Sequence, residues 1–138
     1  MESQEKVSIV LSCIDYRFWP DALPMLEKEF GEFDLIELAG GSKNLTTPLH
    51  EADRKAVLDS IKTAVELHDA KEIILTNHTD CGAYGGSKKF GSFQEEIDFH
   101  KSELKKAEEF IKKSFPKLST KLVIISCDKD NRVNLLLV

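Results

Sequence analysis

The chain has 138 residues, of which 41% are hydrophobic and 31% are charged, and its formal net charge at pH 7 is -5. This length and apolar content predict one domain, residues 1–138, built around a single core. The acidic balance argues against the clustered Lys and Arg surface that nucleic-acid binding requires, so nucleic acid is not an expected partner.

The first residues, MESQEKVSIVLSC, start acidic and contain only a short apolar run, VSIVL. That run is too short for the hydrophobic segment of a signal peptide or for a membrane span. We therefore expect a cytoplasmic protein without a membrane partner. The chain has 3 cysteines, which cannot all pair with one another, and in a reducing compartment thiols more often bind metals or catalyse reactions than form disulfides.

The first three expected elements are a strand, a helix and a second strand. Residues 6–12 and 33–39 are short runs rich in apolar and β-branched residues, which is typical of buried strands. Residues 19–30 predict a short helix between them. Pro24 can move the start of that helix to its own position, because proline fits the first helical turn.

The most regular helical pattern covers residues 46–69, followed by a third expected strand at residues 71–77. Thr47 and Pro48 are placed like an N-cap and a first turn. Behind them, residues that predict one buried face recur at helical spacing: Leu49, Ala52, Val57, Leu58, Ile61, Ala64, Val65 and His68.

A second long helix is expected over residues 92–115, where Ser92 and Glu95 have the spacing of a capping box. Its apolar side is formed by Phe93, Ile97, Leu104, Ala107, Phe110, Ile111 and Phe115. A fourth strand, residues 121–126, precedes a turn and a last apolar run that predicts an antiparallel return. Strands alternating with helices predict an α/β fold in three layers, a mostly parallel central sheet with helices on both faces.

Polar side chains follow the first and third expected strands. Cys13, Asp15 and Arg17 come after the first, and His78 and Cys81 come after the third. Because the carboxyl ends of parallel strands meet at one edge, where such sheets bind ligands, we expect these five side chains to be neighbours.

Two thiolates and one imidazole form a ligand set suited to zinc, with the fourth tetrahedral position left for water or an exchangeable ligand. The alternative is a chance cluster of buried thiols and a capping histidine. Asp15 and Arg17 can form a bidentate ion pair. Beside a zinc ion, Asp15 would either accept a hydrogen bond from zinc-bound hydroxide or occupy the fourth position, whereas a purely structural ion pair would have the same sequence.

The segments CIDYR, residues 13–17, and HTDCG, residues 78–82, resemble the C-x-D-x-R and H-x-x-C signatures of β-class carbonic anhydrases. ELAGGS, residues 37–42, stands where that family has an Ala-Gly loop, and SCDKDNRVNLL, residues 126–136, resembles its closing hairpin. The chain departs from the family at Glu37 and Leu38, where an Arg-Asn pair is usual.

The resemblance implies a zinc ion (Zn²⁺) held by Cys13, His78 and Cys81, with Asp15 and Arg17 as the catalytic dyad. It also implies a sheet order of 2-1-3-4 and a homodimer or dimer of dimers. The implied reaction is the reversible hydration of carbon dioxide to bicarbonate by zinc-bound hydroxide.

Three other functions remain open. The same scaffold could hydrolyse carbonyl sulfide or carbon disulfide, or the metal could be structural in a non-catalytic zinc protein. A redox pair of Cys13 and Cys81 is a weaker hypothesis, because it gives His78 no role. Cys127 is expected in the core, while Phe18, Trp19 and Tyr84 are expected either to wall the pocket or to serve as core or interface anchors.

Overall fold

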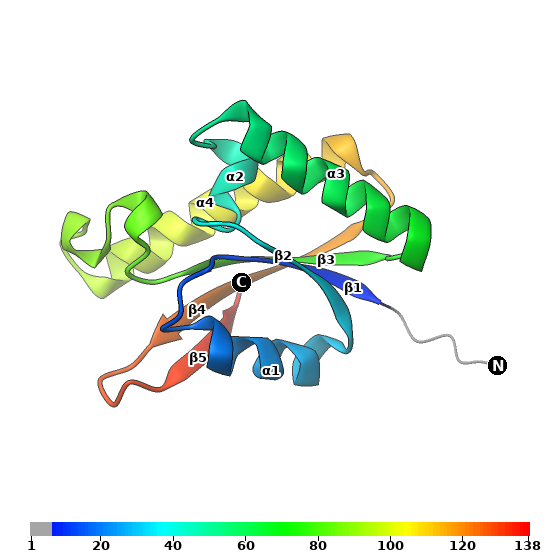
Figure 1. Cartoon of the computed structure of the whole chain (residues 1–138). Helices are drawn as coiled ribbons and strands as arrows, with labels where there is room; N and C mark the ends of the chain where they lie inside the picture. Colours follow the sequence, from blue (N-terminus) through cyan, green and yellow to red (C-terminus); the bar gives the residue numbers. More distant parts are fainter. Residues whose placement is uncertain (1–6) are drawn as a thin grey trace.

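The computed structural model describes residues 7–138, and its centre is a five-stranded sheet (Figure 1). The strands lie in the order β2-β1-β3-β4-β5. The first four are parallel to their neighbours, and β5 returns antiparallel to β4. The predicted order 2-1-3-4 and the antiparallel last strand are confirmed. The strand bounds are β1 Ser8–Ser12, β2 Phe33–Glu37, β3 Glu72–His78, β4 Ser119–Cys127 and β5 Val133–Leu137.

Helices cover both faces of the sheet, with α1 on one side and α2, α3 and α4 on the other (Figure 1). Side chains that alternate along β1 divide the core accordingly, because successive residues of a strand point to opposite faces. Ile9 and Leu11 pack in the layer under α3 and α4, and Val10 packs in the layer with α1. The helices are α1 Trp19–Phe30, α2 Lys43–Thr46, α3 Glu51–His68 and α4 Phe93–Ser114, with short 3₁₀ turns at Gly82–Tyr84 and Ser87–Lys89.

Helix α1 has the expected bounds, Trp19–Phe30, and runs through Pro24 with Pro20 in its first turn. One expected helix start is wrong. Helix α3 begins at Glu51 and not behind Thr47, since the chain first forms the unpredicted helix α2.

The later start of α3 has a clear cap and a consequence for burial. The Asp53 carboxylate accepts a hydrogen bond from the His50 amide at 3.3 Å, which satisfies one of the free N–H groups near the helix start. Leu49 therefore lies before the helix and is 81% exposed, and Ala52 and His68 are exposed as well. Val57, Ile61 and Ala64 form the buried face as predicted.

Helix α4 begins as expected. The Ser92 hydroxyl accepts a hydrogen bond from the Glu95 amide at 3.1 Å, whereas the Glu95 carboxylate binds the Gly91 amide instead of Ser92. Phe93, expected on the apolar face, is exposed.

Along the part of the chain that the structure describes, no helix has the length and apolarity needed to cross a bilayer.

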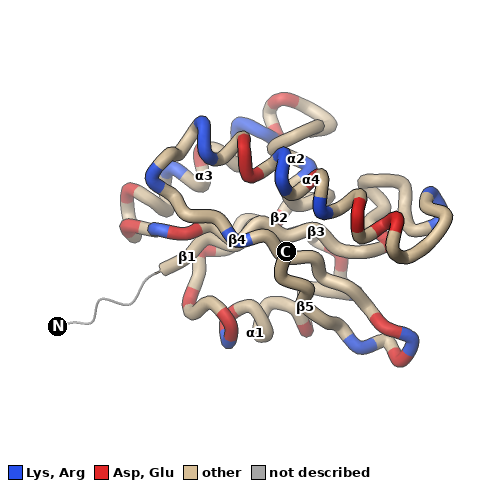
Figure 2. The backbone as a smooth tube through the Cα atoms, turned by 180° about the vertical axis from the view of Figure 1, so that it is seen from behind, with Lys and Arg blue, Asp and Glu red and all other residues tan. Residues whose placement is uncertain are grey.

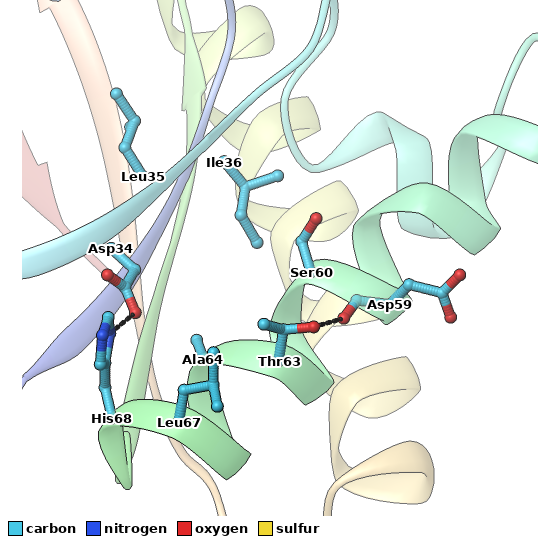
Figure 3. Close-up of a pocket in the computed structure, with 9 residues that line it drawn as sticks. All are labelled: Asp34, Leu35, Ile36, Asp59, Ser60, Thr63, Ala64, Leu67 and His68. Atoms are coloured by element: carbon cyan, nitrogen blue, oxygen red, sulfur yellow. Dashed lines mark hydrogen bonds and ion pairs between the residues drawn. The ribbon is translucent and has the colours of Figure 1, made fainter.

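The free edge of the sheet at β2 adjoins the end of α3. Figure 3 shows the His68 ring beside the Asp34 carboxylate, near Leu35 and Leu67. His68 Nδ1 lies 2.6 Å from Asp34 Oδ2, and these residues line a groove of about 400 Å³. Figure 2 shows Lys, Arg, Asp and Glu interspersed along α3 and α4.

Candidate metal centre

Two neighbouring strands carry the candidate ligands to one edge of the sheet. Cys13 directly follows β1, and His78 is the last residue of β3, which pairs with β1 in parallel. The chain then turns at Asp80, whose φ of 56° is left-handed, and presents Cys81. The ligand atoms of Cys13, His78 and Cys81 all lie within 4.8 Å of one another. Segments far apart in the sequence thus form one cluster.

A glycine lets the loop after β2 approach this cluster closely. At Gly41, where φ is +52°, a Cβ atom would lie 3.0 Å from the Thr76 carbonyl oxygen and 3.1 Å from the Cys13 nitrogen. Only glycine fits without displacing backbone. The loop then directs the Gly40 amide at the Cys13 sulfur, 3.3 Å away, where the N–H favours a thiolate.

The His78 ring leaves one nitrogen available to a cation. Its Nδ1 lies 2.7 Å from the Thr79 carbonyl oxygen, which can only accept, so Nδ1 carries the hydrogen and Nε2 keeps its lone pair. That Nε2 is buried and has no hydrogen-bond partner among residues 7–138. Phe18 holds the ring from one side, with centroids 4.3 Å apart. A fixed, unpaired imidazole nitrogen beside two sulfurs is what a zinc site requires.

The two thiols differ strongly in acidity. A hydrogen bond from Cys81 lowers the pKa of Cys13 to about 4, which outweighs the opposing effect of burial. The same interaction with Cys13, together with burial, raises the pKa of the Cys81 thiol. Burial lowers the pKa of His78, but the adjacent Cys13 sulfur and the Thr79 carbonyl outweigh it and raise that pKa. These surroundings favour the thiolate form of Cys13, which is the form in which a cysteine binds metals.

Asp15 and Arg17 form the expected ion pair next to this cluster. Arg17 Nη2 lies 2.7 Å from Asp15 Oδ2 and Nε lies 3.0 Å from Oδ1. These hydrogen bonds hold the pKa of Asp15 below its usual value, despite partial burial. Asp15 Oδ2 also lies 3.7 Å from His78 Nε2, so the carboxylate faces the donor cluster.

Two cavities are lined by residues that neighbour the cluster in the sequence or contact it. One, of about 280 Å³, lies between the loop that carries Ala39 and the turn at Ala83, and is lined in part by Leu38 and Leu49. The other, of about 680 Å³, is lined by Arg17 and Phe18 and by the half-buried Cys127, which also packs against the core layer beside α1. Phe18 is the aromatic that both lines a cavity and touches the cluster.

The other candidate aromatics lie elsewhere. Tyr84 is buried and its ring packs edge-on against Phe99 and His100, whereas Trp19 is 40% exposed on α1.

Sequence reasoning missed two acidic residues around the centre. Asp80, between two candidate ligands, binds Arg17 through its carboxylate at 2.9 Å. Glu96, nearly fully buried on α4, accepts a hydrogen bond from the Asp80 amide at 2.7 Å. Its spacing of four from His100 was a signal that both share the buried face of α4.

Glu37, one of the two departures from the family pattern, is a third acidic residue near Cys13. Its Oε2 is buried without a hydrogen-bond partner in the described part of the chain, and burial followed by the charge of Cys13 raises its pKa. Its position at the end of β2 gives it the same edge of the sheet as Cys13.

Comparisons with known proteins give one family model and two uncharacterized relatives. A family model described as "Putative carbonic anhydrase" matches residues 3–135. An uncharacterized protein of Rickettsia conorii is 31% identical over 130 residues, covering 90% of this chain and 69% of that protein. An uncharacterized protein of Rickettsia bellii is 30% identical over 130 residues, with 90% and 79% covered.

Solved structures of similar fold include several carbonic anhydrases. The carbonic anhydrase of Glaciozyma antarctica matches with a TM-score of 0.59 at 17% identity, covering 93% of this chain and 80% of that one. A β-carbonic anhydrase of Trichomonas vaginalis matches with a TM-score of 0.57 at 17% identity, covering 99% and 87%. Tetrameric β-carbonic anhydrases of Sordaria macrospora match with a TM-score of 0.57 at 14% identity, covering 97% and 82%. At these identities the likeness establishes the shared fold.

Proposed function

The chain belongs to the carbonic anhydrase family whose model spans it, and on that premise we propose that it is a zinc enzyme which reversibly hydrates carbon dioxide to bicarbonate. One observation carries the proposal above the others. The donor atoms of Cys13, His78 and Cys81 converge within 4.8 Å, and the ring nitrogen among them is buried and unpaired. Two sulfurs and one imidazole favour zinc over harder cations.

In this proposal Cys13, His78 and Cys81 hold the zinc ion. When bound in such a site, zinc acts as a Lewis acid that makes water a nucleophile at neutral pH. The Thr79 carbonyl fixes the orientation of the His78 ring, and the Gly40 amide stabilises the Cys13 thiolate. These partners set the geometry of the donors before any substrate arrives.

Asp15 and Arg17 would act on the substrate side of the same centre. Arg17 keeps Asp15 ionised and turned toward the cluster, so Asp15 can accept a hydrogen bond from the attacking water and orient it. The reaction adds water to the carbon of carbon dioxide and releases bicarbonate and one proton. The 280 Å³ cavity beside Ala39 and Ala83 has the partly apolar lining suited to a small uncharged gas.

The decisive experiment combines metal analysis with stopped-flow hydration of carbon dioxide. We expect about one zinc per chain in the wild type and loss of both metal and activity in Cys81→Ser. Cys127→Ser is the matched control, because this third cysteine lies outside the cluster and should leave both quantities unchanged. A purified chain that binds no metal would overturn the proposal.

The same assay separates the alternatives. Zinc at one per chain, with no hydration above the buffer background between about pH 6 and 9, would favour a non-catalytic zinc protein. The departures at Glu37 and Leu38 make that outcome worth testing. Faster turnover of carbonyl sulfide or carbon disulfide than of carbon dioxide would change the substrate and keep the metal chemistry.

We also propose that one zinc domain, residues 1–138, functions as a homodimer or dimer of dimers in the cytoplasm. The tetrameric β-carbonic anhydrases of Sordaria macrospora, which share the fold, support assembly. Exposed apolar side chains lie at both outer strands, Leu35 on β2 and Leu137 on β5. Light scattering of wild type, Leu35→Glu and Leu137→Glu tests assembly, and a monomeric wild type would contradict it. Three free thiols suit a reducing compartment.

A further inference from the structure

We propose that Asp80 and Glu96 are positioning residues, which hold Arg17 and, through it, the Asp15 carboxylate against the candidate metal centre. The proposal deepens the carbon dioxide chemistry proposed above and rests on it for its kinetic test. Neither residue belongs to the metal-binding set or to the dyad. Asp80 hydrogen-bonds to Arg17, and Glu96 hydrogen-bonds to Asp80 from the core.

Glu96 connects helix α4 to the segment after β3. Glu96 is 3% exposed, and its Oε2 accepts a hydrogen bond from the Asp80 amide at 2.7 Å. Its Oε1 accepts a hydrogen bond from the Ser87 hydroxyl at 2.8 Å. A buried carboxylate with both oxygens engaged is held in one place, so it fixes the two loop segments that it binds.

Hydrogen bonds to both carboxylate oxygens also fix the Asp80 side chain. Asp80 Oδ1 accepts a hydrogen bond from the Ser87 amide at 2.8 Å, which leaves Oδ2 directed at Arg17 Nη1, 2.9 Å away. The Asp80 carbonyl oxygen accepts a second hydrogen bond, from Arg17 Nη2, at 2.9 Å. One residue therefore binds two of the three guanidinium nitrogens.

Arg17 in turn binds Asp15, the other member of the proposed dyad. Arg17 donates to Asp15 through Nε and Nη2, so Asp80 and Asp15 together occupy the whole planar fork of the guanidinium. A fork that is bound on two edges cannot rotate without breaking bonds to both carboxylates. Asp80 thereby limits how far Asp15 can move relative to His78.

Stability alone does not account for this arrangement. The side chains of Arg17 and Asp80 are 44% and 47% exposed, and ion pairs this open contribute little to folding. The contact instead fixes the orientation of Arg17, because Asp80 connects the buried Glu96 to this side chain, which binds Asp15 beside the donor cluster. A displacement of a reacting group by about 1 Å can reduce a rate by about 100-fold.

The kinetic test uses zinc-loaded full-length protein. Asp80→Asn removes the charge but keeps a side chain that tolerates the left-handed backbone at this position, where φ is 56°. We expect kcat for carbon dioxide hydration to fall by roughly 10- to 100-fold, with KM and zinc content close to wild type. Glu96→Gln should act in the same direction and more weakly, since the amide keeps one acceptor oxygen. Asp98→Asn, an exposed acid on the same helix, is the matched control and should change neither kcat nor zinc content.

A double-mutant comparison separates positioning from general loosening of the loop. If Asp80 acts through Arg17, then Asp80→Asn should change kcat by less than about 2-fold in an Arg17→Ala background. Equal fold-losses in the wild-type and Arg17→Ala backgrounds would overturn the proposal. So would an Asp80→Asn protein with the kcat of the wild type.

A spectroscopic measurement keeps the proposal independent of activity. The chain has three arginines, so its ¹H–¹⁵N spectrum contains few Nε–H signals, and Arg54→Lys and Arg132→Lys identify the one from Arg17. We expect Asp80→Asn to shift that signal and to speed its exchange with water, while Asp98→Asn leaves it in place. If the zinc-loaded wild type hydrates no carbon dioxide, the proposed function fails, yet this signal still decides the positioning. An unmoved Arg17 signal in Asp80→Asn would refute it.

Discussion

Two buried histidines in this molecule have the same burial and opposite chemistry. His78, at the end of β3, and His100, inside α4, are 2% and 0% exposed, and each has an Nε2 without a hydrogen-bond partner in the described chain. His78 Nδ1 faces a carbonyl and carries the hydrogen, so its Nε2 keeps a lone pair. His100 Nδ1 faces the Asn77 amide nitrogen at 3.3 Å and accepts, so its Nε2 carries the hydrogen.

The neighbours of the two rings explain the difference. Around His78, the Cys13 sulfur and the Thr79 carbonyl raise the pKa against the effect of burial. Around His100, burial dominates and lowers the pKa, although Glu96 lies 3.7 Å away and acts in the opposite direction. Burial therefore does not make a histidine a metal ligand. The hydrogen-bond partner of the opposite ring nitrogen decides which nitrogen is free.

Exchanging each histidine for glutamine should give the largest contrast. His78→Gln removes one of three proposed ligands, and we expect zinc affinity to fall by at least about 100-fold, since even residues that only hydrogen-bond to a ligand change metal affinity by about 10- to 100-fold. His100→Gln should leave zinc affinity within about 3-fold of wild type, because the His100 Nε2 carries a hydrogen and offers no lone pair to a cation. Competition with a chromophoric chelator measures both constants. Comparable losses in the two variants would show that the tautomer argument is wrong.

Replacing His100 with an apolar residue should lower the free energy of unfolding and leave the zinc content unchanged. In His100→Leu the Asn77 amide and the Glu96 carboxylate lose their polar neighbour while remaining buried. We expect the free energy of unfolding to fall by about 1 to 3 kcal/mol, the usual cost of a buried polar group left unpaired. Urea denaturation of the zinc-loaded protein measures it. An unchanged or higher unfolding free energy would mean that the polar contacts of His100 contribute nothing to stability.

The architecture was predictable because its signals are local. Apolar β-branched runs separated by helical patterns predicted the four parallel strands, and the rule for strand ends placed Cys13 and His78 at one edge. Helix starts were less predictable: Thr47 and Pro48 looked like a cap, but the chain formed α2 first and capped α3 with Asp53. Competing caps differ by too little free energy for a pattern to rank them.

The residues that hydrogen-bond around the candidate centre could not be predicted from the sequence, for a different reason. Asp80 lies between two predicted ligands, yet nothing in its type indicates that it binds Arg17. Glu96 is in the first turn of α4, where an acidic residue ordinarily complements the helix dipole. Only the packing of α4 against β3 makes it a buried hydrogen-bond acceptor. Local patterns thus predict the ligands, while tertiary packing selects the residues that hold them.

A smaller change sharpens the comparison at the ring contacts of His100. Tyr84→Phe deletes the hydroxyl that accepts from Asn77 Nδ2 at 3.1 Å and keeps the edge-on contacts of the ring with Phe99 and His100. We expect the unfolding free energy to fall by about 0.5 to 1.5 kcal/mol, with zinc content unchanged. Tyr16→Phe, at a tyrosine that is 78% exposed, is the matched control for stability and should have almost no effect.

The smallest expected effect is a difference in how acid destabilises the fold. Because burial lowers the pKa of His100 in the folded protein, the unfolded chain binds more protons at this residue as the pH falls below the ordinary histidine pKa of about 6.5. The stability that neutral His100 contributes is therefore present above that pH and is lost as the pH falls through the lowered folded pKa. Glu96 and Glu103 oppose this shift and so reduce the effect.

Urea midpoints of wild type and His100→Gln, compared between about pH 7 and 5, isolate this contribution, since all other titrating groups are common to both proteins. The wild type should lose more stability over this range than the variant. Parallel curves would mean that His100 takes up its proton equally in the folded and unfolded chain. In that case the contrast with His78 would rest on the hydrogen-bond partners of the two rings alone.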